Sequence, residues 1–205
     1  MTIYTIFNIA LRLKFYIISM IQNKKDALIF LGEKVKTPNL VKHCLAAGSA
    51  MKGLAHYFRE DEETWEMAGL LHDIDYEETK NKPEEHSLKG AKMLREQGLS
   101  NDIIEAVKTH NAIHGLLPQT KMAKALFCVD PLTGLIVAST LVLPSKKIKD
   151  LSLENVLNRF KEKSFARGAS RNIIQQCQPL LGLSLSDFVS FVLQGMQSIA
   201  DDLSL

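Results

Sequence analysis

The stretch that decides both the fold and the chemistry of this chain is "EMAGLLHDIDYEE", residues 66–78. Its first half is apolar at helical spacing and includes Leu70 and Leu71. It then places an imidazole, His72, directly beside a carboxylate, Asp73. Burying a neutral polar group without a partner costs roughly 2–7 kcal/mol, and burying an unpaired charge costs far more. The stretch therefore predicts a buried helix end whose two polar side chains must be compensated by a partner.

Length and composition fit one domain, or one domain with an appendage. The chain has 205 residues, of which 46% are hydrophobic, and this is enough to bury a sizeable core. The formal charge is +2, so no strong basic field points to a nucleic-acid partner, and none is expected. Cys44, Cys128 and Cys177 stand alone, without a CxxC pair, and are expected to be small buried hydrophobes. Such cysteine usage suits a reducing compartment, and a cytoplasmic location is expected.

From residue 24 onward, residues that are typical of helix starts recur along the chain. Residues 24–35 predict a short amphipathic helix. Thr37 and Pro38 are typical of the start of the next helix, because proline there lacks only an N–H that would be unpaired anyway. That helix is expected to run to about Phe58. Its inward stripe is formed by Leu40, Cys44, Ala47, Met51, Leu54 and Phe58.

Further helices are expected along the rest of the chain. Asp61 caps the helix that ends at the opening stretch, Pro83 begins one that Gly98 ends, and Ser100 caps the next. Apolar periodicity then predicts helices over 119–143, with a bend at Pro131, and over 151–162, 168–181 and 184–203. No segment alternates with period two, as a strand would. The sequence therefore predicts an all-α fold.

The first 23 residues are unusually apolar, and several roles for them stay open. Arg12 and Lys14 interrupt the segment, and the uncharged run 1–11 falls short of the roughly 20 residues that a membrane span needs. A core or partner-facing helix, a weak membrane-surface anchor, and an extension upstream of a true start at Met20 are the alternatives. No membrane span is expected. Residues 24–145 are expected to form the main domain, and 146–205 a helical extension packed on it.

Polar side chains recur on the apolar faces of these helices. His43, for example, lies three residues after Leu40 and four before Ala47, and Asp130 lies four after Leu126. A lone inward histidine is usually a satisfied core residue, but four of the six histidines recur in this way together with two aspartates. Inward imidazoles and carboxylates compensate one another best around metal ions. Small residues beside them would let the helices approach closely, with ordinary packing as the alternative: Ala47, Gly48, Gly69, Gly90 and Ala91.

The order of these residues resembles the HD-domain superfamily of metal-dependent phosphohydrolases. It runs His43, the doublet His72-Asp73, His86, His110 and Asp130, within the words "GLLHDID", "EEHSLKGAKML", "IIEAVKTHN" and "ALFCVDPLTGLI". The six-residue pattern resembles the two-metal branch, and it is most similar to a bacterial HDIG-type hydrolase family. The resemblance covers roughly residues 24–205 and extends to "PSKKIKDL" and "KEKSFARGASR". One departure is that Asp75 replaces the glycine of HDIG.

The resemblance implies a role for each of the six residues. His43, His72, Asp73 and Asp130 would hold a first divalent transition metal. Asp73 would bridge to a second metal held by His86 and His110, and it would take part in catalysis through water activation. Iron or manganese is favoured, with cobalt, nickel or zinc as alternatives.

The implied activity is hydrolysis of a phosphomonoester or phosphodiester in a nucleotide or another small phosphorylated metabolite. The alternative is an HD-fold sensory module that binds metal and nucleotide without turnover. No competing nucleophilic motif is present. Oligomeric state is left open, with a homo-oligomer among the options.

Phosphate binding is expected to need cations from the protein. Arg167 in "SFARG" precedes a glycine that would expose backbone amides to an anion. Several lysines and His114 are further candidates, and for each of them an exposed surface position without a role in binding is the alternative. The predicted substrate-binding residues are Arg167, Lys89, Lys92, Lys146, Lys147 and His114. Asp75, Glu77 and Glu78 would either orient a ligand histidine or form an acidic loop.

Overall fold

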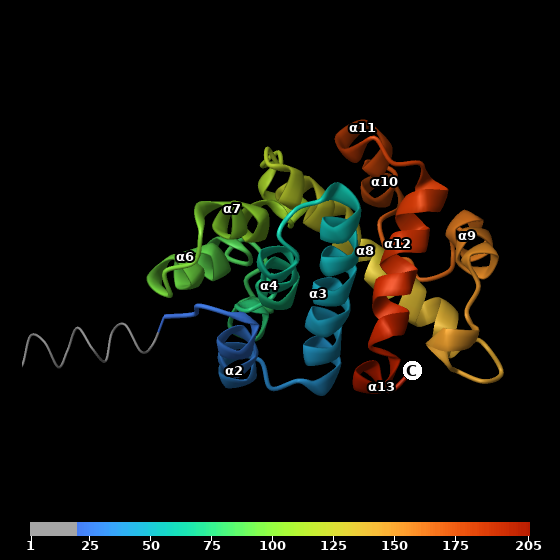
Figure 1. Ribbon diagram of the computed structural model, residues 1–205, viewed down its shortest axis with the longest axis horizontal. Coiled ribbons are helices and arrows are strands. Elements are labelled where there is room, and N and C mark those ends of the chain that lie inside the picture. The colour runs from blue at the N-terminus through green and yellow to red at the C-terminus, as the bar shows by residue number, and fades with distance from the viewer. Residues whose placement is uncertain (1–19) are drawn as a thin grey trace, which may run out of the picture.

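The computed structural model describes residues 20–205, in which helices pack on one another and no strand is formed (Figure 1). The prediction of an all-α fold is therefore confirmed. The expectations for the N-terminal segment fall almost wholly on residues 1–19, which lie outside the described part of the chain. Ile21, just after them, is buried in the core.

The first two thirds of the described chain form helices close to the predicted ranges. Asp61 accepts a hydrogen bond from the Thr64 N–H at 2.8 Å, so it caps its helix as predicted. Pro131 lies inside a helix that continues through it. The elements are α2 (Lys24–Lys34), α3 (Pro38–Phe58), α4 (Glu62–Leu71), α5 (Tyr76–Thr79), α6 (Leu88–Glu96), α7 (Asn101–Thr109), the 3-10 turn η1 (Ala112–His114) and α8 (Lys121–Leu141).

The helix α3 starts where predicted, with Thr37 as its N-cap residue. Thr37 makes no side-chain capping bond. Instead the Glu77 carboxylate accepts hydrogen bonds from the N–H groups of Lys36 at 2.7 Å and Thr37 at 2.5 Å. Glu77 thereby connects the segment before α3 to α5. The sequence does not predict this contact, because its partners lie about 40 residues apart.

The helix expected to begin at Pro83 begins instead at Leu88. The preceding residues form turns, and Ser87 has a φ of +68°, a region that non-glycine residues rarely adopt. The buried Ser87 hydroxyl donates a hydrogen bond to the carbonyl of Lys108, 3.1 Å away. A contact with α7, rather than the proline, therefore fixes where α6 begins.

The C-terminal part consists of shorter helices than predicted. Residues 168–181 form two helices, because Pro179 cannot donate a bond inside one long helix but fits within the first turn of a second. Ser170 caps the first of them. The elements are the 3-10 turn η2 (Ile148–Asp150), α9 (Leu153–Lys161), α10 (Arg171–Ile174), α11 (Cys177–Leu181), α12 (Leu185–Ser198) and α13 (Ala200–Leu203).

The core is arranged around α3, which packs between α4 and α12 and against α8 (Figure 1). A Cβ added to Gly69 of α4 would lie 2.6 Å from the backbone of Ala47 in α3. A Cβ on Gly195 of α12 would lie 2.6 Å from the Ser49 carbonyl oxygen on α3. These contacts involve backbone, so no side-chain rotation relieves them. The predicted close helix approach is therefore confirmed at Gly69.

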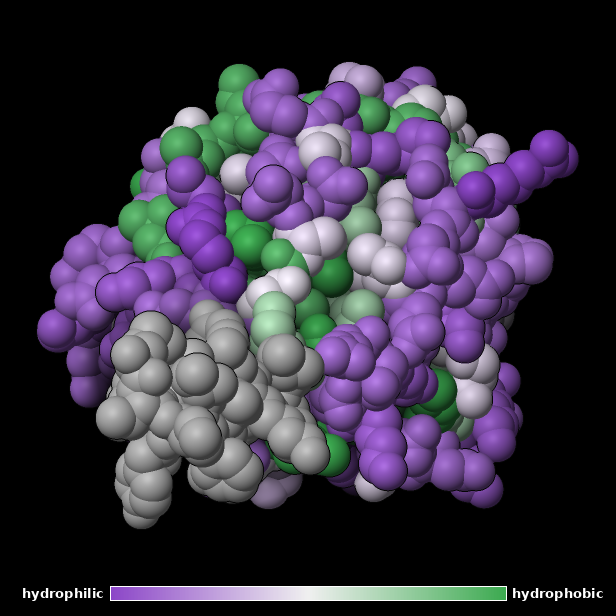
Figure 2. All heavy atoms as spheres, turned by 60° about the vertical axis from the view of Figure 1, so that its left-hand side comes forward, coloured by the Kyte–Doolittle hydropathy of each residue, from purple (hydrophilic) through white to green (hydrophobic). Residues whose placement is uncertain are grey.

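The helices after residue 146 share this core. α12 contacts α3, and α9, α10 and α11 contact α8. Buried side chains from both parts of the chain belong to a single hydrophobic cluster, which includes Met51, Leu126 and Phe188. The three cysteines are free and buried, as expected. Apolar side chains show only in small groups on the face drawn in Figure 2, which is largely hydrophilic.

One helix of the described residues, α8, is long and apolar enough to cross a membrane by length and composition. Of its most apolar 18-residue window, 61% is buried inside the molecule. The segments 171–181 and 185–198 would pass the same test only if counted together across a bend of 105°. Helices at the core of a bundle share these properties, and α8 occupies such a place.

The crossing of α3 and α4 gives a first test. We expect Gly69→Ala to lower the free energy of unfolding by about 1–3 kcal/mol or more, because its methyl group would press on backbone. The matched control is Gly32→Ala in α2, where an added Cβ meets nothing within 4 Å. That change should stabilise the protein by about 0.4–1 kcal/mol. Urea unfolding of both variants measures the difference, and equal effects would contradict the packing described.

Candidate metal centre

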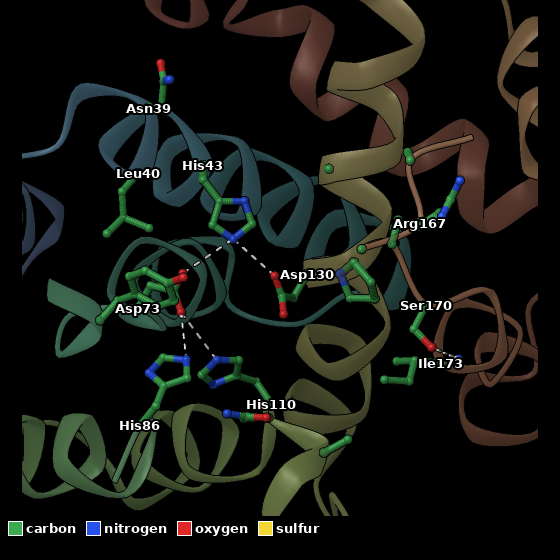
Figure 3. Close-up of a pocket in the computed structure, with 18 residues that line it drawn as sticks. Asn39, Leu40, His43, Asp73, His86, His110, Asp130, Arg167, Ser170 and Ile173 are labelled. Atoms are coloured by element: carbon green, nitrogen blue, oxygen red, sulfur yellow. Dashed lines mark hydrogen bonds and ion pairs between the residues drawn. The ribbon is translucent and has the colours of Figure 1, made fainter. Parts of the chain in front are cut away.

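Six side chains from separate parts of the bundle converge in one place, and Figure 3 draws five of them, without His72. They come from α3, the C-terminal end of α4, the turn before α6, the C-terminal end of α7 and the middle of α8. Their ligand atoms form three overlapping groups, and within each group all atoms lie within 4.8 Å of one another. The six are those predicted from the sequence: His43, His72, Asp73, His86, His110 and Asp130.

The Asp73 carboxylate lies between two sets of imidazoles. Its Oδ1 is 3.2 Å from Nε2 of His86 and 3.5 Å from Nε2 of His110. Its Oδ2 is 3.6 Å from Nε2 of His43 and 3.5 Å from Nε2 of His72. Each oxygen of one carboxylate therefore faces its own pair of ring nitrogens.

Asp130 adds a second carboxylate on one side only. Its Oδ1 lies 3.1 Å from Nε2 of His43 and 3.7 Å from Nε2 of His72. These two Nε2 atoms are themselves only 3.1 Å apart. The pair of His43 and His72 thus faces two carboxylates, whereas the pair of His86 and His110 faces Asp73 alone.

Two of the histidines are oriented by the helices that they end. His72 and His110 are the C-cap residues of α4 and α7. Each Nδ1 lies 2.7 Å from the carbonyl oxygen three residues earlier, Gly69 for His72 and Val107 for His110. A carbonyl can only accept, so Nδ1 carries the proton in both rings and the Nε2 lone pair points inward.

The other two histidines are oriented by side chains. Nδ1 of His86 lies 2.9 Å from Oδ1 of Asp75. Nδ1 of His43 lies 3.2 Å from the Thr133 hydroxyl, which itself donates to the Asp130 carbonyl at 2.8 Å and so accepts from the ring. All four rings therefore present Nε2 to the centre, which is the tautomer that a metal ligand needs.

The carboxylates change the protonation of the rings around them. Burial alone would lower the pKa of His72, but Asp73 and Asp130 outweigh it and raise the pKa to about 9. Burial likewise opposes the charged form of His86, and hydrogen bonds to Asp73 and Asp75 raise its pKa to about 10. Although burial disfavours ionisation of Asp73 and Asp130, the neighbouring imidazoles hold both pKa values below the usual range.

This donor set fits divalent transition metals. Imidazole nitrogen suits iron, zinc, copper and nickel, and carboxylate oxygen suits manganese and magnesium. The inward Nε2 atoms and the oxygens of the two ionised carboxylates converge on shared points. His43, His72, Asp73 and Asp130 could hold one ion, and Asp73, His86 and His110 could hold another.

A cavity of about 750 Å³ opens onto the centre. Such a volume is typical of small-ligand pockets. The wall opposite the centre comes from the segment before α10, residues 166–170. Arg167 lies on this wall, exposed, with its guanidinium turned away from Asp130 in Figure 3. Asn39, Tyr76 and Asn111 also line the cavity, and no sequence signal singled them out.

The structure does not bring the other predicted substrate-binding residues into this cavity. Lys89 pairs with Glu78 at 2.8 Å, and Lys92 is exposed on α6. Lys146 and Lys147 are exposed in the loop after α8. The helix α7 ends just before His110, whose ring bonds back to the Val107 carbonyl of that helix. His114 therefore lies in η1 and does not share a helix face with His110. Nε2 of His114 lies 2.6 Å from the His86 carbonyl oxygen, behind a ligand rather than facing the cavity.

Two supporting residues were missed or left open by the sequence. Asp75 is fully buried and orients His86, which settles the alternatives left for it. The departure of position 75 from glycine was the signal. Arg171 donates hydrogen bonds to six backbone carbonyls between residues 159 and 169, including Ala166 at 2.7 Å and Phe165 at 2.6 Å. It therefore holds the loop that carries Arg167.

The fold and the six-residue set are those expected of an HD domain. Residues 40–133, just under half of the chain, match the family model of the HD domain, a family whose members are mostly metal-dependent hydrolases. The match spans the first and last of the six residues.

Two curated relatives are named ribonuclease Y. The protein from Lawsonia intracellularis is 27% identical over 140 residues, which cover 67% of this chain and 27% of the relative. The protein from Oleidesulfovibrio alaskensis is 28% identical over 138 residues, which cover 66% of this chain and 26% of the relative. The chain thus spans about a quarter of the length of the curated relatives it matches. No solved structure matches.

The raised pKa values predict opposite pH trends for metal binding and metal-free stability. In the metal-free protein His72 and His86 have pKa values of about 9 and about 10, above the ordinary 6.5. Protonation therefore stabilises the metal-free fold fully below pH 6.5, and this stabilisation is lost as pH rises toward 9–10. Metal binding requires the neutral rings and releases those protons.

We therefore expect metal affinity to rise between pH 6.5 and 9, while the unfolding free energy of chelator-treated protein falls over the same range. Competitive metal titration and urea unfolding at several pH values measure the two trends. Metal affinity that does not change with pH would contradict the protonation described.

Proposed function

We propose that this protein is a phosphohydrolase that acts on a nucleotide or another small phosphorylated metabolite at a centre of two divalent transition-metal ions. The observation that carries the proposal is the position of Asp73, whose two oxygens face separate pairs of imidazoles. A carboxylate placed in this way is suited to bridging two ions. Two nearby ions supply an activated water and stabilise both the attacking and the leaving oxygens in phosphoryl transfer.

The proposed first ion has His43, His72, Asp73 and Asp130 as ligands, and the second has Asp73, His86 and His110. The mixture of imidazole nitrogen and carboxylate oxygen supports iron or manganese, with cobalt, nickel and zinc as alternatives. The chain's own contribution is to fix each donor atom before metal or substrate arrives. The carbonyls of Gly69 and Val107 do this for two rings.

The residues around the centre support a substrate with a phosphate at the metals and the remainder in the cavity. Arg167 is the only lysine or arginine among the described residues that line it. Rotation of its side chain toward the centre would offer a phosphate two aligned donors. Tyr76, beside His86, offers an aromatic edge or face to the rest of the substrate. One cation suits a substrate with few phosphates.

The named relatives raise RNA as an alternative substrate, but the charges argue against it here. Binding an RNA backbone requires several phosphate contacts from lysine or arginine. Lys89, three residues after His86, is paired with Glu78, and Arg167 alone among the described lysines and arginines lines the cavity. The whole chain carries only +2. A small phosphorylated substrate therefore remains the proposal.

The test is a substrate screen on metal-reconstituted protein. We expect hydrolysis of at least one nucleotide, dinucleotide or generic phosphodiester, with about two ions per chain. Asp73→Ala removes a ligand of both proposed ions, so it should bind less than one ion and lose activity while keeping its helical circular dichroism. Cleavage of single-stranded RNA alone would overturn the small-molecule class. Tight metal and nucleotide binding without any turnover would favour the sensory module.

Arg167 gives a second test, once a substrate is known. Loss of a hydrogen bond to a charged group costs about 1.5–3 kcal/mol, so Arg167→Ala should raise KM roughly 10- to 100-fold. Metal content should stay unchanged, and Arg167→Lys should recover only part of the loss. The matched control is Lys163→Ala, four residues earlier in the same loop and exposed. An unchanged KM in Arg167→Ala would remove the residue from the substrate site.

A further inference from the structure

Asp75 is a buried carboxylate that the six-ligand set does not use. Its side chain is fully buried, and among the ion pairs of residues 20–205 its one partner is His86. Oδ1 lies 2.9 Å from Nδ1 of His86, and Oδ2 accepts a hydrogen bond from the N–H of Gly90 at 2.8 Å. A buried charge this costly persists only where its contacts matter to the structure or the site.

His86 is the ligand that most needs such a partner. The other three histidines sit in α3 or at the ends of α4 and α7, where helix geometry fixes the backbone. His86 lies in the turn before α6, next to Ser87 with its φ of +68°. Its ring is held at Nδ1 by Asp75 and its carbonyl by His114. Without Asp75 the ring has no acceptor to select its tautomer.

Gly90 shows that α6 is built around this carboxylate. A Cβ at Gly90 would lie 3.2 Å from Cγ of Asp75, so glycine lets the first turn of α6 pack directly on it. The unpaired N–H of that first turn then finds its acceptor in Oδ2. Asp75 therefore joins the start of α6 to the ring of His86, and one carboxylate positions both.

The distribution of carboxylates around the centre makes the charge of Asp75 important as well as its position. The pair of His43 and His72 faces two carboxylates, whereas the pair of His86 and His110 faces one oxygen of Asp73. A carboxylate hydrogen-bonded to the outer nitrogen of an imidazole raises its basicity toward a metal. Asp75 thus adds a negative charge next to His86, on the side of the centre that has only one carboxylate oxygen.

We propose that Asp75 is a positioning residue that holds His86 for the second metal ion and sets the affinity of that ion without contacting it. This inference rests on the two-ion centre proposed above. Asp75 lies outside the ligand set, yet it would determine whether the centre holds one ion or two.

The test uses Asp75→Asn in the full chain, with manganese as the probe. Both contacts of Asp75 are N–H donors, and an amide has only one oxygen, so asparagine satisfies one of them and turns its NH2 toward the other. Loss of such a partner typically costs 10- to 100-fold in metal affinity. We expect about that loss for the second manganese, and a first manganese bound as in wild type.

Three comparisons sharpen the result. His86→Ala defines complete loss of the second ion. Glu78→Gln removes a half-exposed carboxylate from the neighbouring α5 and should leave both ions bound. Gly90→Ala presses a methyl group on Asp75 without changing any charge, so it should weaken the second ion by a smaller factor. It also tests the inference if Asp75→Asn fails to fold.

The outcomes separate this inference from the proposed function. Two ions bound with wild-type affinity in Asp75→Asn and in Gly90→Ala would overturn the role of Asp75 and leave the two-ion centre standing. Equal weakening of both ions would also overturn it, because a general structural role has that effect. A single ion in the wild-type protein would overturn the two-ion proposal and this inference together.

Discussion

The burial of the Asp73 carboxylate among four imidazoles is the constraint on which the rest of the molecule depends. Its two oxygens lie 3.2–3.6 Å from four Nε2 atoms that come from four different segments. Those segments can meet only because α4 crosses α3 at backbone distance, where Gly69 has no room for a side chain. The Gly69 carbonyl also orients His72. One residue thus contributes to the packing of the core and to the geometry of the centre.

Much of the fold could be predicted from local periodicity, and the six central residues from their order along the chain together with that periodicity. His43 and Asp130, on apolar faces of α3 and α8, point inward as helix geometry requires, whereas His86 lies in the turn before α6, where that argument does not apply. The predicted helix caps Asp61 and Ser100 also act through neighbours in the chain. Such features are encoded within a few residues and survive any tertiary arrangement.

What could not be predicted depends on partners distant in the sequence. α6 begins at Leu88 because Ser87 bonds to Lys108, and nothing near Pro83 encodes that contact. The sequence predicts that Lys89 binds phosphate, but in the structure its ammonium group pairs with Glu78. A lysine's own neighbours in sequence do not tell whether its charge is free or already compensated. The supporting roles of Arg171 and His114 were hidden for the same reason.

The hold of Arg171 on six backbone carbonyls has a consequence for how such a protein diversifies. Because the guanidinium binds main-chain atoms, the loop over 162–170 keeps its course whatever side chains it displays. Residues 166–170 of this loop line the cavity but supply none of the six central groups. Substitutions that accumulate on that wall in evolution therefore change the shape and charge of the cavity, while the six central side chains keep their places.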